Sequence, residues 1–482
     1  MEIITPREQI RKFFFEKHLE FLTSVPQQRL QEMILSSCMK GHSGKMVDYG
    51  ECGPAHRTTY GHFLAKGKWD DKRLEKTQKR ESFQTVLELS RRDGTPLFIS
   101  IDDTVLPKTA PSSKAKRPTQ GAGWHYSHLE GKVVYGHQVH AAIIGTGDTS
   151  LCYSLKRCCP ENGTKIDMTL EILRSLPNQT GAYILMDSWY TNPSVLDACQ
   201  EKGCHLIGAM KTNRILFPEG KRTSASDLAA SLDPGCFHPV TVKGRTYMVY
   251  RYEGPLNKID HAVVLLSYPA AAMGRKCALR VFLCSDSTLS DEAILEYYSH
   301  RWTIEVLFRA HKRYMALKSF MVRAAKALDR LLLVLALAHF FFSCGLGLIV
   351  PFHIGLHRCR TAFVNSCICS FIDLYLFCHP SALSNIRGAD HRVHILPPHK
   401  LAQDVELLPG IRQHLELPRV GNDGQIVIGP FGIAGVVCVS RGQFHQMPHT
   451  PAYQPAVTLH IAVFPAPGPQ HLRQRHCNAG FF

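Results

Sequence analysis

The stretch "AYILMDSWYTNPSVLDACQEKGCHLIGAMKT", residues 182–212, indicates the fold class most directly. It begins with an apolar run that ends at Asp187, a pattern typical of a buried strand. The segment "PSVLDACQEKG" then reads as a helix, and "CHLIGAMKT" reads as a second strand. Strands that alternate with helices predict an α/β domain, in which helices cover the faces of a sheet.

Three further strands come before this stretch and follow one another closely, as in an antiparallel meander. They are "PLFISID" (96–102), "GHQVHAAIIG" (136–145) and "TSLCYSLKR" (149–157), and the helical "DMTLEILRSL" follows them. A three-stranded meander followed by alternating helix and strand describes a mixed sheet with flanking helices. This is the element order of an RNase H-like fold.

The regions on either side of this core differ from it in pattern. Residues 1–92 are predicted to form a helical N-terminal domain, because apolar residues recur there at three- and four-residue spacing. Between 215 and 286, "PVTVKGRTYMVYRYEG" and "HAVVLLSYP" predict a β-rich insertion. The RNase H-like core would then comprise residues 93–214 and 287–344.

The tail, residues 345–482, has an atypical composition. Lys400 is its only lysine, whereas roughly half of the chain's histidines lie there. No sustained strand or helix period is visible, so we expect a poorly ordered segment without a core of its own. A shifted reading frame is an alternative explanation, which the encoding DNA would test.

The net charge of +16 favours a polyanionic partner, because clustered cations attract phosphates regardless of sequence. Basic residues crowd one predicted helix pair of the N-terminal domain: Lys66, Lys68, Lys72, Arg73, Lys76, Lys79 and Arg80. A solvated helix face is the simpler interpretation of such a run. The overall charge nevertheless favours contact with DNA by this domain.

Three features bear on the compartment. The 17 cysteines are scattered and form no C-x-x-C pair, which indicates reduced thiols rather than a disulfide or zinc framework. The apolar stretch 331–350 is long enough to span a bilayer, but His339, Ser343 and two glycines interrupt it and favour a buried core helix. The N-terminal residues do not resemble a signal peptide, so we expect a cytoplasmic protein.

Acidic residues end two of the predicted core strands. "FISIDDT" delivers Asp102 and Asp103, and "YILMDSW" delivers Asp187. Any one of them alone would more often be a cap or a turn residue. A third carboxylate, Glu305, lies in "EYYSHRWTIEVLFRAHK" (296–312), and three carboxylates at one site would suit a hard divalent cation.

The segment around Glu305 also places polar residues at helical spacing. Counting from Tyr298, Arg301 is at +3, Glu305 at +7 and Lys312 at +14, so all four are expected on one face of a single helix. Such a stripe either decorates a solvated surface or presents charges and an aromatic ring to a ligand. Beside strand-end carboxylates, Arg301 and Lys312 could hold phosphates, and Tyr298 or Trp302 could stack on an unpaired base.

These residues carry a resemblance to a known family. Tyr298, Arg301, Glu305 and Lys312 match the Tyr-x2-Arg-x3-Glu-x6-Lys signature of one group of DDE transposases of bacterial insertion sequences. "IDDT" and the block that begins at Asp187 look like the first and second aspartate blocks of that family. The β-rich insertion is also a feature of this group, and the resemblance covers most of the chain before the tail.

The resemblance implies an RNase H-like core in which Asp102, Asp187 and Glu305 are catalytic and hold two Mg²⁺ ions, with Mn²⁺ as a substitute. Asp102 is preferred to Asp103 because the family's first block usually reads Asp-x-Thr, and because neighbours on a strand face opposite ways. The implied activity is cut-and-paste DNA transposition, in which water nicks the element's end and the freed 3′-OH attacks the opposite strand or target DNA. The implied DNA-binding residues are Tyr298, Arg301, Trp302, Lys312, Lys211 and Arg214.

The implied partner is DNA, both at the element ends and in the target. We expect a homodimer in a synaptic complex, in the bacterial cytoplasm with the nucleoid, and no membrane. Two alternatives stay open. A structure-selective nuclease, such as a Holliday-junction resolvase, would cut DNA without joining strands, and a DNA-binding relative that has lost catalysis would not cut.

Overall fold

The computed structural model of this chain describes residues 5–39, 41–116, 118–127, 130–344, 355–357 and 359, and the three short segments 425–427, 436–440 and 458–462. The chain divides into two compact units, Met1–Cys359 and Arg360–Phe482. Within the second unit, three strands pair in an antiparallel sheet: β13 (Gln425–Val427), β14 (Val436–Ser440) and β15 (Thr458–Ala462). The prediction of a poorly ordered tail falls mostly outside the described residues.

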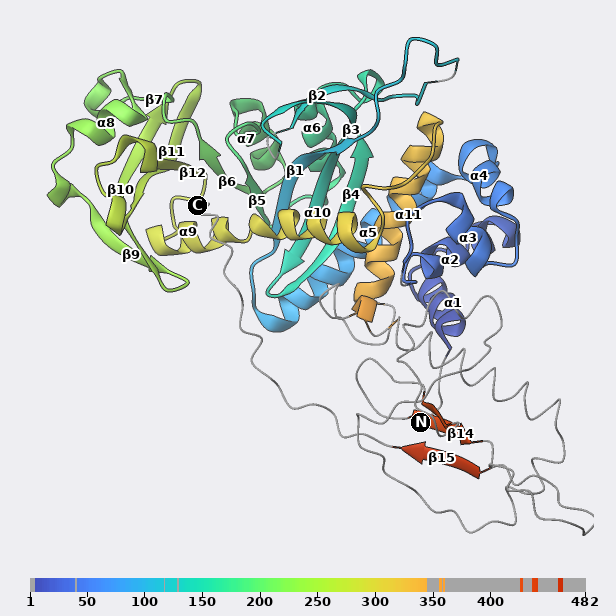
Figure 1. Cartoon of the computed structure of the whole chain (residues 1–482). Helices are drawn as coiled ribbons and strands as arrows, with labels where there is room; N and C mark the ends of the chain where they lie inside the picture. Colours follow the sequence, from blue (N-terminus) through green and yellow to red (C-terminus); the bar gives the residue numbers. More distant parts are fainter. Residues whose placement is uncertain are drawn as a thin grey trace, which may run out of the picture. The chain divides into compact units, whose positions relative to one another are not determined.

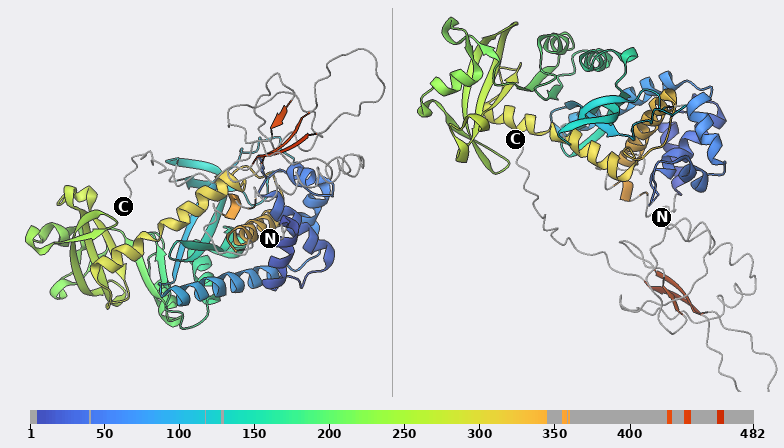
Figure 2. Two further views of the ribbon diagram at one scale, coloured as in Figure 1. Left: turned by 90° about the horizontal axis from the view of Figure 1, so that it is seen from below. Right: turned by 45° about the horizontal axis from the view of Figure 1, so that its top comes forward.

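The first unit begins with five helices (Figure 1). They are α1 (Pro6–Glu16), α2 (Ser24–Ser36), α3 (Met46–Cys52), α4 (Arg57–Lys66) and α5 (Asp71–Asp93). The side chain of Asp70 caps the start of α5, and Gly94 ends the helix in the left-handed conformation that glycine adopts readily. The 23-residue helix α5 runs along strands β3 (Lys132–Thr146) and β4 (Thr149–Arg157) of the sheet (Figure 2).

One twelve-stranded sheet forms the centre of this unit. Its hydrogen-bonded order is β2-β3-β1-β5-β6-β12-β11-β10-β7-β8, with β4 paired to β3 and β9 paired to β10. The strands of the first half are β1 (Phe98–Pro107), β2 (Gly123–Ser127), β3 (Lys132–Thr146), β4 (Thr149–Arg157), β5 (Tyr183–Met186) and β6 (His205–Met210). β1 runs antiparallel to β3 and parallel to β5, which in turn runs parallel to β6. The predicted mixed sheet with flanking helices is therefore confirmed.

Helix α6 (Lys165–Ser175) lies between β4 and β5 in the chain, and α7 (Pro193–Glu201) connects the parallel strands β5 and β6. Thr164 and Asp167 form a capping box at the start of α6. At the start of α7, the side chain of Asn192 accepts a hydrogen bond from a backbone N–H and Pro193 takes the first helical position. Both helices therefore begin at residues whose side chains bond to the first free backbone N–H groups.

The predicted β-rich insertion continues the same sheet. Its strands are β7 (Ile215–Leu216), β8 (Thr223–Ser224), β9 (His238–Val242), β10 (Arg245–Leu256), β11 (Ile259–Pro269) and β12 (Arg280–Cys284), with α8 (Ala225–Ser231) among them. β12 pairs antiparallel with β6, so hydrogen bonds run without interruption from the first half of the sheet into the second. One hydrophobic cluster joins both halves, with Leu185 and Ile207 from one side and Val263 and Phe282 from the other.

The prediction of one continuous helix over 296–312 is wrong. Two helices, α9 (Asp291–Ser299) and α10 (Trp302–Tyr314), lie end to end across the sheet (Figure 1). At the junction the backbone N–H of Arg301 bonds to the carbonyl of Tyr298, three residues back, instead of four. Tyr298 therefore belongs to the last turn of α9, while Glu305 and Lys312 belong to α10.

Helix α11 (Ala325–Cys344) packs against β4 and against the N-terminal helices α2, α4 and α5. Among the described residues it is the one helix long and apolar enough to cross a membrane, but 89% of its apolar window is buried inside the protein. The buried Arg330 guanidinium bonds to Asp71 at 2.8 Å and lies over the Trp69 ring. These contacts are those of a buried core helix. The sequence predicted such a helix for 331–350, of which residues 331–344 are described.

Candidate active site

Two neighbouring strands bring the first two candidate acids together. β1 and β5 are parallel, and Ile101 pairs with Met186, so Asp102 and Asp187 are each one step further along adjacent strands. Adjacent strands lie about 4.8 Å apart, and alternate residues share a face. Phe98, four residues before Asp102, and Leu185, two residues before Asp187, share the faces of these acids. Both pack with Ile294 and Leu295 of α9 in one hydrophobic cluster. Asp102 and Asp187 therefore lie on the face that α9 and α10 cover.

Arg301 joins Asp102 to the third candidate acid. Its Nη1 atom lies 3.3 Å from Asp102 Oδ2, and its Nη2 atom donates to Glu305 Oε1 at 2.7 Å. The guanidinium is largely buried, so both contacts are charge-assisted hydrogen bonds away from bulk water. Residues separated by about 200 positions in the sequence thus meet around one cation.

The electrostatics of Asp102 reflect this crowding. Burial, and after it the charge of Asp187, raises the pKa of Asp102 to about 7, although the Arg301 guanidinium acts in the opposite direction. A carboxyl group that ionises near neutral pH beside a second carboxylate is a candidate for a functional role.

Asp103 lies on the opposite face of β1 and has a different environment. Its carboxylate accepts hydrogen bonds from Lys165 Nζ at 2.7 Å, from the Tyr190 hydroxyl at 2.6 Å and from Gln138 Nε2 at 2.6 Å. Burial acts to raise the pKa of Asp103, but these three donors lower it below its ordinary value. Asp103 therefore links β1 to α6, to β3 and to the segment that follows Asp187.

The turn after Asp187 is fixed by its own hydrogen bonds. Asp187 Oδ1 accepts from the backbone N–H of Trp189 at 2.8 Å, and the Thr191 hydroxyl donates to the Asp187 carbonyl at 2.9 Å. Arg214, a predicted DNA-binding residue, donates to the Thr191 carbonyl at 3.2 Å. Arg214 therefore supports the turn that carries Asp187, whereas Lys211 is exposed to solvent.

The remaining residues of the predicted stripe differ in their surroundings. Lys312 Nζ donates to Thr104 Oγ1 at 2.6 Å, on the same face of β1 as Asp102, and burial lowers its pKa. The Tyr298 ring is half-buried, with its centroid 4.7 Å from that of Phe282. Trp302 is 44% exposed, and the Arg309 guanidinium lies 5.9 Å from the centre of its ring.

The three candidate acids differ from a ready metal site in arrangement but not in chemistry. In the described part of the chain, no group of three or more His, Cys, Asp or Glu residues is arranged as a ready metal site. The donor chemistry nevertheless fits, because all three candidates supply the oxygen ligands that hard cations prefer. A cation, the Arg301 guanidinium, already lies between Asp102 and Glu305.

The residues that support the site were not among those predicted from the sequence. Lys165, Gln138 and Tyr190 surround Asp103, and the 46%-exposed Trp189 ring lies 4.2 Å from Lys165 Nζ. The aromatic pair Trp189 and Tyr190, two and three residues after Asp187, was the one visible signal in the sequence for part of this group. Lys165 and Gln138 carried no comparable signal, because only the tertiary fold brings them to Asp103.

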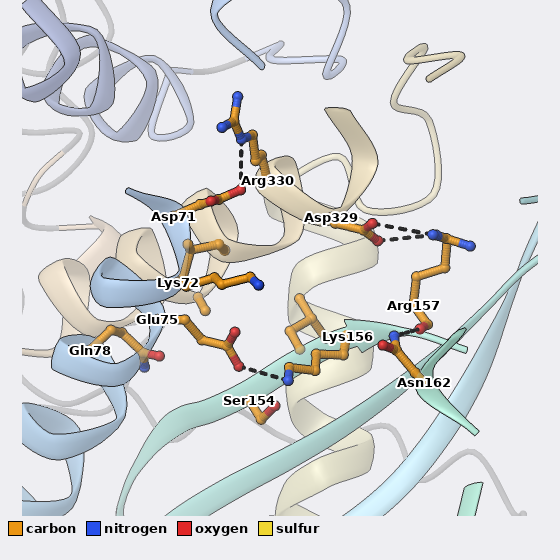
Figure 3. A pocket seen from close by; sticks show the side chains of 13 residues that line it. Asp71, Lys72, Glu75, Gln78, Ser154, Lys156, Arg157, Asn162, Asp329 and Arg330 are labelled. Atoms are coloured by element: carbon orange, nitrogen blue, oxygen red, sulfur yellow. Dashed lines mark hydrogen bonds and ion pairs between the residues drawn. The ribbon is translucent and has the colours of Figure 1, made fainter. Parts of the chain in front are cut away.

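A separate cavity of about 270 Å³ lies between α5, β4 and α11 (Figure 3). Ion pairs cross it or flank it: Arg330 with Asp71 at 2.8 Å, Lys156 with Glu75 at 3.1 Å and Arg157 with Asp329 at 3.0 Å. These pairs join the N-terminal helices and α11 to the sheet. The cavity therefore lies where the helices pack on the sheet, and the candidate acids do not line it.

The architecture and the acids on one sheet face define a class of mixed α/β proteins with a carboxylate site at the carboxyl end of β5. The family model described as "Transposase DDE domain" matches residues 93–341, more than half of the chain, so the chain belongs to this family. The family is one of transposases, whose partner is DNA and which generally use divalent metal ions. A comparison with curated proteins finds no match.

Proposed function

We propose that the chain is the DNA transposase of an insertion sequence, with an RNase H-like core, and that it cleaves the element's ends and transfers them into target DNA. The observation that carries the proposal is the Arg301 guanidinium shared by Asp102 and Glu305 beside Asp187. Asp102 and Asp187 follow the last paired residues of β1 and β5, at the carboxyl end of β5, and Arg301 connects Asp102 to Glu305. Open α/β sheets commonly place their ligands at such an end.

In this proposal Asp102, Asp187 and Glu305 are the catalytic residues and hold two Mg²⁺ ions, which Mn²⁺ can replace. When bound, such ions activate the attacking oxygen and stabilise the leaving oxygen of an in-line displacement at phosphorus. Arg301 and Lys312 hold the phosphates on either side of the scissile bond. Arg301 does so as a planar fork, and Lys312 does so as a point charge.

The other proposed DNA contacts follow from exposure. Trp302 can stack on an unpaired base because nearly half of its side chain is accessible, and the exposed Lys211 can reach a phosphate. Tyr298 and Arg214 contribute less directly, since the first packs on Phe282 and the second holds the Thr191 carbonyl. The N-terminal helices, residues 1–92, supply a DNA-binding domain, and two copies act together in the synaptic complex.

The test is the substitution Glu305→Gln, which removes the charge and keeps the shape. We expect Mg²⁺-dependent DNA cleavage to be lost while DNA binding persists. Glu296→Gln is the matched control, because Glu296 is an exposed acid on the neighbouring helix α9. Full cleavage by Glu305→Gln would contradict the site assignment.

A second candidate is a DNA-binding relative with impaired catalysis. The observation that favours it is the lack of a ready three-ligand metal site among the described residues. Purified protein with Mg²⁺ and labelled element ends separates the possibilities. Joined strands support the transposase, cleavage without joining supports a structure-selective nuclease, and binding alone supports the impaired relative.

A further inference from the structure

The hairpin of β2 and β3 presents an exposed aromatic surface. Trp124 is 67% exposed, Tyr126 54% and Val133 57%. Trp124 pairs with Tyr135 and Tyr126 with Val133, so the four side chains share one face, and we call this group the hairpin surface. Single exposed apolar residues are ordinary, but a contiguous group marks a site of interaction.

The hairpin surface lies on the same sheet face as the candidate acids. Alternate residues of β3 share a face, so Val133, Tyr135 and Ala141 lie on the same side of the sheet. Ala141 pairs with Asp102 on β1. Lys312 of α10 contacts this same face through Thr104. Helix α10 covers this face between the acids and the hairpin, where Leu106 and Val139 are fully buried, and the hairpin surface is exposed beyond it. A strand held at the acids would therefore reach the hairpin surface around α10.

The distance along the strands suits a polymer. Pro107, five residues after Asp102, pairs with Gly136, and Gly136 also pairs with Gly123. Trp124 is one step further, which places it roughly 20 Å from Asp102 at about 3.3 Å per residue. One strand of duplex DNA advances about 3.4 Å per nucleotide and an unpaired strand can extend further, so roughly six nucleotides or fewer span this direct separation.

The charge of this region selects among possible occupants. The segment 108–133 contains Lys108, Lys114, Lys116, Arg117 and Lys132, against a single acid, Glu130. Lys114, Lys116 and Lys132 are exposed. A second copy of the chain would bring an equally basic hairpin against the first and repel it, whereas a polyanion is attracted.

We propose that the hairpin surface binds an unpaired DNA strand that leads away from the candidate active site. This inference rests on the proposed function. Trp124 and Tyr126 are two residues apart on β2, roughly 7 Å, which leaves room for one base on each ring. Base faces are open to aromatic side chains only where the strand is unpaired, because neighbouring bases cover them in a duplex. The surrounding lysines hold the phosphates.

The experiment uses the full chain and measures the fluorescence anisotropy of two probes. One is a labelled single-stranded oligonucleotide of mixed sequence, and the other is the same strand in a duplex. For the double variant Trp124→Ala, Tyr126→Ala we expect single-strand affinity to fall about tenfold or more, with duplex affinity unchanged. Phe15→Ala is the matched control, since Phe15 is a 68%-exposed aromatic residue on α1, and it should change neither affinity. The single variant Trp124→Phe keeps an aromatic ring and should therefore retain most of the single-strand affinity of the wild type.

Three results would overturn the inference. The first is unchanged single-strand binding by the double variant, and the second is an equal loss of affinity for both probes. The third is a shift of the double variant to a smaller species in size-exclusion chromatography, which would mean that a second copy covers the surface in the wild type. Mg²⁺-dependent cleavage by the wild-type chain is measured in parallel. If the wild type cleaves DNA and the double variant binds single strands normally, this inference fails and the proposed function stands. If the wild type never cleaves but its single-strand binding depends on Trp124 and Tyr126, only the proposed function fails.

Discussion

The Tyr190 hydroxyl donates a 2.6 Å hydrogen bond to Asp103 Oδ1 and thereby ties the turn after Asp187 to strand β1. Asp103 follows Asp102 directly, and Tyr190 is three residues after Asp187. The bond therefore helps to set the spacing between the two candidate acids, although Asp103 itself faces away from them.

Tyr190→Phe should loosen this spacing. Because the lost bond has a charged, mostly buried acceptor, we expect the free energy of unfolding to fall by about 1.5–3 kcal/mol. The dissociation constant for Mn²⁺, measured by calorimetric titration, should rise as well. Tyr153→Phe is the control, because its hydroxyl bonds to Ser175 at 3.0 Å, away from the acids. Equal effects of both variants on Mn²⁺ affinity would show that Tyr190 has only a structural role.

Arg301→Gln should increase metal affinity in the absence of DNA. Asp102 and Glu305 would lose the guanidinium that neutralises them, so a divalent ion would no longer compete with it. DNA binding by the same variant should weaken, since a phosphate contact is lost. Arg309→Gln, an exposed cation on the same helix, should leave Mn²⁺ affinity unchanged. Weaker Mn²⁺ binding by Arg301→Gln would instead mean that Arg301 organises the carboxylates for the metal.

A buried histidine pair should make the protein sensitive to mild acid. His311 Nε2 and His339 Nδ1 lie 3.0 Å apart, and burial lowers the pKa of His339 to about 4 and holds that of His311 well below its ordinary value. Unfolded histidine has a pKa near 6.5, so below that pH the unfolded chain takes up protons that the folded chain does not. Stability is complete above pH ~6.5 and is lost as the pH falls toward 4, by up to about 1.4 kcal/mol per pH unit for each histidine.

Urea unfolding at a series of pH values checks this expectation. His339→Gln should make the loss of stability between pH ~6.5 and 4 shallower, because one of the groups that the unfolded state protonates is gone. An identical pH dependence for the variant and the wild type would mean that other groups govern acid unfolding.

Replacing Lys72, Arg73 and Lys76 together by glutamine should weaken DNA binding and reduce its salt dependence by roughly one unit of slope per lost phosphate contact. All three are exposed on α5, while Lys79, from the same basic run, is buried in an ion pair with Glu75 and is left unchanged. The measurement is the affinity for a duplex over a range of salt concentrations. An unchanged slope would locate the DNA contact elsewhere on the chain.

The sequence predicted the features that depend on local pattern. The apolar run before Asp187 and the meander that includes "FISID" specify their strands by periodicity alone, and the mixed sheet follows from their order. The same reasoning identified 331–344 as part of a core helix, because its polar interruptions suited a packed interior better than lipid.

The features that the sequence did not predict depend on distant contacts. Helical spacing from Tyr298 to Lys312 could not reveal the break at Arg301, since the residues there have near-helical backbone angles and no proline or glycine marks the junction. The run of strands between 215 and 286 predicted an insertion, but not that its strands continue the central sheet. That continuity depends on the pairing of β12 with β6, which local sequence does not show. The hydrogen bonds of Asp103 likewise arise only when α6, β3 and the turn at Tyr190 have assembled.

The central claim is that Asp102, Asp187 and Glu305 converge on bound metal, and metal-directed protein cleavage tests it most directly. Fe²⁺ replaces Mg²⁺ in the full chain with DNA, and hydrogen peroxide and ascorbate are added. Bound Fe²⁺ reduces the peroxide to hydroxide and a hydroxyl radical, which cuts the backbone near the ion, and ascorbate returns the resulting Fe³⁺ to Fe²⁺. We predict cuts in three segments, around residues 102, 187 and 305, that excess Mg²⁺ suppresses and that Glu305→Gln reduces. Cuts confined to one segment, or a pattern that Mg²⁺ does not suppress, would contradict the claim.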